Sequence, residues 1–428
     1  MQHKPLIVIL IAVFSITVTV TGQKLVNSPY SRFNLGSIEP SGSFRSMGMG
    51  GVGNSLRDNT SIYVSNPASY SSFDTISFIF DFGLDYSMNY LSDGAIRSSS
   101  DDMNFDHLMM GFPVSKGWGV ALGILPYTNG YYRISESVTS SDPVIGAYST
   151  FHDGEGGFNQ FFLGAGGTLS KHFSAGINMT ILLGQVSRSN QFVFDNQYDY
   201  YSVYHNSSTE KLQLRGVNLD YGLQYTTTVK KDYFLNAGLT FTGGRNYKSD
   251  YVHLTSRYTA YGNSTADTLA YISDDSTKTF IPGSFKAGIS FGKKNKFTVA
   301  LDYNYSKWSA SRIPGAAGYT ADTKSLLFGL EYIPEKYSNF SFLKRMEYRL
   351  GGHLADNYLI INGKQLKEAG VTFGIGIPLP RTYSKANLFF DFTKRHGPEG
   401  SSLHRENFYT MGVSLNFYDY WFQKRKYE

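Results

Sequence analysis

The sequence predicts an all-β protein: a transmembrane antiparallel β-barrel of about 14 strands with an N-terminal plug segment inside its lumen. Three observations predict this fold. Apolar and aromatic residues alternate with polar ones over many long runs, the connections between these runs alternate between short and long, and aromatic residues make up 16% of the chain against 17% charged ones. Such a chain can present one apolar face to lipid and one polar face to a lumen.

The first residues resemble an export signal. His3 and Lys4 precede an apolar run from Leu6 to about Val18, and the small residue Gly22 follows, which predicts a signal peptide over 1–22. No later stretch approaches the length of a membrane-spanning helix, and the 428 residues include no cysteine, so disulfides cannot stabilise the exported chain. We therefore divide the chain into the signal peptide 1–22, an N-terminal periplasmic or plug segment 23–75 and a barrel 76–428.

The alternation is clearest from Ile76 to Tyr90, where every even position from Phe78 onward is apolar or aromatic and most residues between them are polar. Runs at 217–225, 297–305 and 409–417 follow the same rule. A period of two over this length predicts strands with one apolar and one polar face. The expected strands are 76–90, 101–113, 118–134, 157–170, 173–195, 209–228, 233–255, 279–292, 296–308, 323–333, 345–360, 368–378, 386–394 and 406–417.

The connections favour a bacterial outer-membrane barrel over a soluble β-sandwich. Tight turns are expected at 114–117 and 171–172, whereas 135–156, 256–278 and 311–322 are expected to be long outer loops rich in polar residues and tyrosine. Short turns on the periplasmic side and long loops outside are typical of such barrels. Sandwich strands are shorter, and their outward face is polar. The predicted location is the outer membrane of a Gram-negative bacterium, in contact with its lipid and lipopolysaccharide.

The polar faces of these strands would line the lumen. The residues expected there include Asp81, Asp85, Asp220, Asp302 and Arg349. Opposite charges on facing walls would pair across a narrow interior and hold a plug in place. We expect most of these residues to form ion pairs and hydrogen bonds that stabilise the barrel.

Nothing in the sequence indicates an enzyme. Gly48, Gly50 and Gly53 have the spacing G-x-G-x-x-G, but no strand, helix and βαβ unit surround them, so a dinucleotide site is not expected. No catalytic motif and no metal-ligand spacing occurs, and no cofactor is predicted. The formal net charge of +5 is spread over turns and the C-terminal end, which does not indicate nucleic-acid binding. Asp101, with Asp102, and Asp274, with Asp275, are expected in outer loops.

Two segments resemble the FadL-like outer-membrane transport family. From Arg45 to Ala68 the chain reads R-S-M-G-M-G-G-V-G, then Asp58, then S-I-Y-V-S-N-P-A, and Phe112 to Tyr132 is similar to that family's second turn and third strand. The C-terminal part, from EYIPEKYSNF to WFQKRKYE, resembles barrels of this type from Bacteroidota. The resemblance implies a plug motif and a kinked third strand that opens a lateral gate. The plug motif would comprise Gly48, Gly50, Gly53, Asp58, Asn66, Pro67 and Ala68, and the kink Pro126, Tyr127 and Gly130. Independently, proline removes a ladder donor and a nearby glycine permits a bend.

Two functions remain open. The resemblance implies passage of a hydrophobic ligand, a long-chain fatty acid or an aromatic compound, through the plugged lumen and the lateral gate. The alternative is a non-transporting accessory or structural subunit of an outer-membrane assembly or secretion complex, which would meet protein partners through its outer loops.

Overall fold

The computed structural model describes residues 28–92, 97–139, 146–195, 204–259, 267–316, 319–380, 382–397 and 405–420. The predicted signal peptide 1–22 lies outside the described residues. The strands are β1 (Ser37–Ile38), β2 (Ser77–Ser92), β3 (Arg97–Ser115), β4 (Trp118–Asn129), β5 (Tyr132–Thr139), β6 (Ala147–Thr168), β7 (Phe173–Asp195), β8 (Tyr204–Lys230), β9 (Tyr233–Thr242), β10 (Arg245–Thr259), β11 (Asp267–Asp274), β12 (Lys278–Ile281), β13 (Ser284–Lys293), β14 (Phe297–Ser306), β15 (Tyr319–Thr320), β16 (Thr323–Tyr332), β17 (Glu347–Ile361), β18 (Lys364–Pro378), β19 (Lys385–His396) and β20 (Arg405–Tyr420). The short helices are η1 (Pro29–Arg32), α2 (Phe44–Met47), η2 (Pro67–Ser72), η3 (Trp308–Ala310) and α3 (Phe342–Arg345). Among the described residues, no helix is long and apolar enough to cross a membrane.

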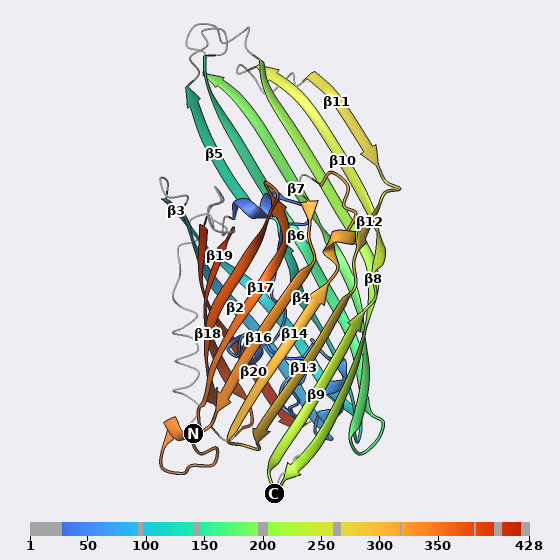
Figure 1. The fold of residues 1–428 in the computed structure, drawn as a ribbon, viewed down its shortest axis with the longest axis vertical. Coiled ribbons are helices and arrows are strands. Elements are labelled where there is room, and N and C mark those ends of the chain that lie inside the picture. Colours follow the sequence, from blue (N-terminus) through green and yellow to red (C-terminus); the bar gives the residue numbers. More distant parts are fainter. Residues whose placement is uncertain are drawn as a thin grey trace, which may run out of the picture.

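The strands form a closed antiparallel barrel of 14 wall strands, as predicted (Figure 1). The barrel closes where β2 pairs with β20, from Ser77 opposite Tyr420 to Ser92 opposite Arg405. Four wall strands are built from shorter pieces: β4 with β5, β9 with β10, β11 with β12 and β13, and β15 with β16. The pairing of β2 with β20 joins the first and last wall strands, so the sheet closes on itself.

The two faces of the wall follow the alternation in the sequence. On β20, Met411, Val413 and Phe417 are exposed to the outside, whereas Ser414 and Asn416 between them are buried. In an isolated soluble protein such an outward apolar face would be in water, but in a bilayer it meets lipid. On β20 the period of two therefore predicts which side chains face inward.

Residues 28–75, here called the N-terminal segment, lie within the ring of strands. Helix α2 packs against β18, β19 and β20, and η2 packs against β4, β6, β7 and β8. Apolar side chains anchor the segment at two levels: Tyr30 and Leu35 join a buried cluster with Trp308, while Ile62 and Tyr70 join a second cluster.

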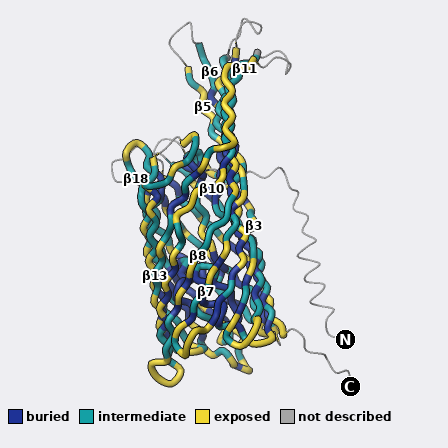
Figure 2. Tube along the Cα trace, turned by 90° about the vertical axis from the view of Figure 1, so that its right-hand side faces the viewer, coloured by how far each residue is buried: buried dark blue, intermediate teal, exposed yellow. Residues whose placement is uncertain are grey.

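Several strands continue beyond the outer rim as a six-stranded sheet, here called the outer extension. It consists of the outer parts of β5, β6, β7, β8, β10 and β11 (Figure 2). A membrane strand needs about 9–11 residues, whereas β7 has 23 and β8 has 27. The expectation of long loops at 135–156 and 256–278 was therefore wrong in large part, because backbone pairing extends the neighbouring strands through both regions. Asp101 and Asp102 were likewise misplaced, since they belong to β3 rather than to a loop.

Candidate functional site

A cavity of about 850 Å³ occupies the interior of the barrel above the N-terminal segment. Its lining comes from that segment and from strands on all sides of the wall. Six inward-facing carboxylates line it, together with two inward-facing cations and one histidine: Glu39, Asp85, Asp106, Asp302, Glu368, Asp391, Lys286, Arg395 and His353. Apolar side chains, including Phe105, Trp308 and Phe389, complete the lining. The cavity is therefore amphipathic, with more negative than positive groups.

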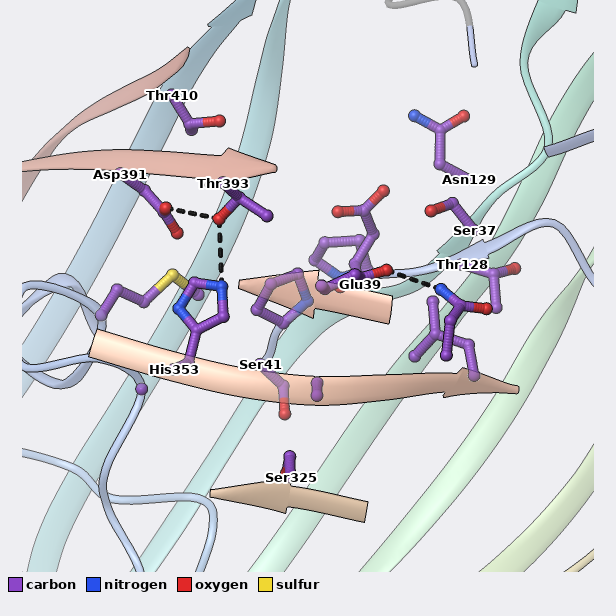
Figure 3. A pocket seen from close by; sticks show the side chains of 18 of the residues that line it. Ser37, Glu39, Ser41, Thr128, Asn129, Ser325, His353, Asp391, Thr393 and Thr410 are labelled. Atoms are coloured by element: carbon purple, nitrogen blue, oxygen red, sulfur yellow. Dashed lines mark hydrogen bonds between the residues drawn. The ribbon is translucent and has the colours of Figure 1, made fainter. Parts of the chain in front are cut away.

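Figure 3 shows the two sides of this cavity. On one side, Thr393 donates a hydrogen bond of 2.6 Å to Asp391 and lies 3.0 Å from Nε2 of His353. Ser37 and Asn129 face them from the other side. The hydroxyl, imidazole and carboxylate side chains offer hydrogen-bonding groups to a polar part of a ligand.

The glycine-rich stretch of the N-terminal segment lies against the barrel wall. Gly50 has φ +73°, and a Cβ there would lie 2.5 Å from the carbonyl oxygen of Phe328, so the approach requires glycine. Its N–H donates to Thr372 Oγ1 at 2.8 Å. Gly53 N and Asn54 N both donate to Asp302 Oδ2, each at 2.8 Å.

A buried ion network joins the N-terminal segment to the last strands. Arg45 contacts Asp58 at 2.9 Å and Glu331 at 2.7 Å. Arg349 bridges Glu331, at 2.8 Å, and Glu347, which also lies 2.6 Å from the amine of Lys385. Burial opposes ionisation of Asp58, but Arg45, Lys385 and two hydrogen bonds from Thr60 hold the pKa of this carboxyl well below its usual range. Three cations and three carboxylates thus neutralise one another.

The Asn-Pro-Ala triplet fixes the other end of the segment. Asn66 caps η2, since its Oδ1 accepts from Ala68 N at 3.1 Å, and its Nδ2 donates to the carbonyl of Asn54 at 2.9 Å. Pro67 touches the wall where β7 has Gly176, whose Cβ would lie 2.4 Å from the Pro67 carbonyl carbon. Gly48 lies at the C-terminal end of α2. The structure therefore brings all residues of the predicted plug motif into contact with the wall or with each other.

The third wall strand is interrupted where the sequence places a kink. Pairing of β3 with β4 ends at Leu108 opposite Ile124, and no pairing joins the remaining described part of β3 to β4 or β5. The register of β4 against β6 shifts between Pro126 and Thr128, with Tyr127 at the shift. Gly130 lies between the end of β4 and the start of β5, and its N–H donates to Gly156 O at 2.9 Å.

Strand β1 pairs with the edge of β4 beyond the point where β3 stops pairing with it. Ser37 and Ile38 pair with Asn129 and Thr128, and Glu39 N donates to the carbonyl of Tyr127 at 3.0 Å. The N-terminal segment thus supplies backbone hydrogen bonds to β4 at a level where β3 does not.

The five predicted lumen residues face inward but do not form one cluster. Asp81 is buried 3.3 Å from His107 Nε2, and Asp85 lines the cavity. Asp220 accepts from Thr242 at 2.6 Å, away from the ion network. Asp302 and Arg349 alone engage the N-terminal segment, directly or through Glu331.

The group around Arg395 and Glu39 was not predicted from the sequence. Arg395 bridges Glu368 at 2.7 Å and Glu406 at 3.1 Å and donates to Ser37 Oγ at 3.2 Å. Burial raises the pKa of Glu39 to about 7; Arg395 opposes the shift, and Asp106 and Glu368 add to it. Isolated charges far apart in the sequence gave no signal of this proximity.

Asp106 was missed for a different reason. Gly83 lies opposite His107 and Leu84 opposite Phe105, so Asp106 is the extra residue of a β-bulge. Both Asp106 and His107 are buried, and their side chains contact each other. Strict alternation cannot place two consecutive residues on one face.

The comparisons with known proteins agree with this fold. The family model described as BamG matches residues 1–428. No curated protein matches the chain. Among solved structures, the CymD monoaromatic hydrocarbon channel is similar with a TM-score of 0.57 and 15% identity, over 90% of this chain and 98% of that one.

Two further solved structures are similar over nearly their whole length. A Pseudomonas aeruginosa FadL homologue gives a TM-score of 0.57 at 10% identity, over 90% of this chain and 99% of that chain. The Pseudomonas putida toluene transporter TodX gives 0.55 at 15% identity, over 90% and 99%. At these identities the likeness shows the fold.

Proposed function

Since the chain belongs to the BamG family and folds like the FadL homologue and the hydrocarbon channels, we propose that it is a plugged barrel of a Gram-negative outer membrane that passes hydrophobic small molecules. Long-chain fatty acids or aromatic compounds enter the cavity from outside and leave sideways between β3 and β4. The N-terminal segment closes the direct route through the lumen.

One observation carries this proposal: the cavity reaches the level where β3 and β4 stop pairing. Phe105 on β3 and Pro126 on β4 both line it, and Phe105 is also exposed on the outer face of the barrel. A ligand in the cavity therefore lies next to the lipid-facing surface of the barrel. The amphipathic lining offers a fatty acid the amine of Lys286 for its carboxylate and apolar residues for its chain.

A disulfide tests the lateral route. Ser37 and Asn129 are antiparallel partners, so their Cα atoms have a separation that a disulfide can bridge. The chain has no cysteine of its own. We expect cells carrying Ser37→Cys with Asn129→Cys to take up a fluorescent long-chain fatty acid at least several-fold more slowly when oxidised, and to recover on reduction.

Each single cysteine variant is the matched control, because it carries the same chemistry without the cross-link. Equal uptake by the oxidised and reduced double variant would contradict a lateral exit beneath β1.

The accessory-subunit function is the second candidate, and the outer extension favours it. β11 pairs with β10 on one side, and all eight of its residues are exposed, including Leu269, Tyr271 and Ile272. Exposed apolar side chains on a strand edge are typical of a surface that binds another protein. This function predicts that Leu269→Ser with Tyr271→Ser releases a partner that co-purifies with the wild type in mild detergent, while fatty-acid uptake is unchanged. A chain that purifies alone in both forms would count against it.

A further inference from the structure

Four cationic side chains gather on the outer face of the barrel, at its outer end. They are Lys367 on β18, Lys394 on β19, Arg405 on β20 and Arg97 on β3, here called the cationic row. All four side chains are exposed. These strands and β2 are consecutive around the wall.

The strand register places the four charges side by side. Ser92 of β2 is opposite both Arg405 and Arg97. Lys367 is opposite His396, two residues along β19 from Lys394. Directly paired residues share a face of a sheet, and alternate residues on one strand do as well. The row thus spans five neighbouring strands at nearly one level.

The cationic row lies directly outside a belt of aromatic side chains. Phe392, Tyr409 and Tyr90 are 46%, 42% and 47% exposed on the same outer face. Tyr409 packs edge-on against the other two, with ring centroids 5.4 Å and 5.5 Å apart. Aromatic girdles mark the level of lipid headgroups in membrane barrels. The four cations therefore lie where the headgroups of the outer leaflet begin.

The charges of the row are available to a ligand. Among the described residues none of the four makes an ion pair within 4.0 Å, while other surface cations such as Arg257 do. Among the residues that the structure describes, two carboxylates lie nearby. Asp101 accepts a hydrogen bond from Tyr86, and Asp356 is opposite Lys367. The row keeps a net positive charge beside them.

We propose that the cationic row binds a phosphorylated lipid of the outer leaflet. Its phosphates would contact Arg97, Arg405 and the two lysines, and its acyl chains would lie along the aromatic belt. Arginine and lysine are the side chains that bind phosphate, and each basic residue near an anionic membrane surface contributes to attraction. The orientation of the row toward the outer leaflet rests on the outer-membrane location in the proposed function; transport plays no part in it.

The test uses purified full-length barrel in detergent and bisphosphorylated lipid A as the probe. We expect Lys394→Gln with Arg405→Gln to weaken lipid A binding about 25-fold, roughly fivefold for each charge removed. Lys230→Gln with Lys231→Gln is the matched control: it removes the same charge from the opposite, turn end of the barrel, and its affinity should equal the wild type. Dephosphorylated lipid A should bind the wild type and the row variant equally weakly.

Unchanged lipid A affinity of the row variant would overturn the proposal, as would an equal loss in the control. Displacement of lipid A by inorganic phosphate at equal concentration would also overturn it, because the ligand would then be the free ion. A change in gel mobility on heating the sample shows that each variant was folded before heating. Since the assay measures no uptake, a failure of the transport proposal leaves its result unaffected.

Discussion

Arg45 and Glu331, which are 286 positions apart in the sequence, form a bidentate ion pair. Nε of Arg45 lies 3.0 Å from Oε2 of Glu331, and Nη2 lies 2.7 Å from Oε1. Both side chains are nearly buried, at 11% and 4% exposed. Such geometry fixes orientation as well as distance. The pair therefore sets how the N-terminal segment sits in the barrel.

We expect Arg45→Met to destabilise the folded barrel by about 3–5 kcal/mol, because it leaves Glu331 and Asp58 buried without their partner. The measurement is the free energy of unfolding in urea, with the protein in lipid vesicles. Lys344→Met is the control. Lys344 pairs with Glu335 at 3.6 Å with both side chains more than half exposed, and its loss should cost about 0.5 kcal/mol. Equal costs for the two variants would contradict a structural role for the network.

Asp302→Ala should cost about 2–3 kcal/mol, because the N–H groups of Gly53 and Asn54 lose their shared acceptor inside the protein. Asp302→Asn keeps an oxygen at the same place and should cost less than about 1 kcal/mol. The free energy of unfolding distinguishes them, and protease cleavage within residues 50–60 should rise in the alanine variant alone. If Asp302→Asn cost as much stability as Asp302→Ala, the charge of the carboxylate, and not its hydrogen-bond acceptor, would stabilise the N-terminal segment.

Gly50→Ala should destabilise the barrel more than Gly363→Ala. Both glycines have φ +73°, so both substitutions introduce the same backbone strain, about 1–2 kcal/mol. A Cβ at Gly363 meets nothing within 4 Å, whereas at Gly50 it would collide with the backbone of Phe328 and Gly352. Thermal unfolding of the two variants therefore separates wall contact from backbone strain. Equal melting temperatures of the two variants would mean that the N-terminal segment can move away from the wall in Gly50→Ala without loss of stability.

Glu39 should make stability depend on pH. Burial raises its pKa to about 7 in the folded protein, from 4.5 when unfolded, so folding favours the protonated acid. Its contribution is constant below about pH 4.5 and becomes less favourable as the pH rises through 7, by up to about 3 kcal/mol. Glu39→Gln imitates the protonated form. We expect the stability difference between variant and wild type to grow in favour of the variant from pH 5 to pH 8, measured as free energy of unfolding.

The reverse trend, with the wild type gaining on Glu39→Gln as the pH rises, would mean that Arg395 outweighs burial at this site.

Much of the wall could be predicted from the sequence because one face meets lipid and the other meets polar groups. The strands at 173–195 and 297–306 were found within two residues on this basis. The break between β9 and β10 at Gly243 and Gly244 was missed. Aromatic residues stay at odd positions across it in the sequence, but Phe241 is exposed on β9 whereas Tyr247 is buried on β10. The extension of β8 and β10 was missed because exposed strands in water carry polar residues on both faces, like loops.

The candidate site was less predictable. Asp302 and Arg349 were identified as inward-facing, but which of them meets the N-terminal segment depends on register and barrel closure, which alternation does not encode. The positions of Glu39 and Arg395 depend on the path of an irregular segment, where no period exists to guide a prediction. The glycine at position 50 was found through its spacing, and its contact with the wall gives a physical reason for it.

The ion network also constrains the order of assembly. Arg45 lies near the start of the chain, whereas its partner Glu331 belongs to β16. Glu347 and Lys385, which extend the network through Arg349, follow β16. Contacts between such distant residues form late, because closing a long loop costs entropy before the contact compensates for it. Asp58 follows Arg45 closely in the chain, but Glu331 is synthesised much later. Arg45 therefore meets Glu331 only once β16 has joined the wall, so the final strands complete the contact that holds this part of the N-terminal segment.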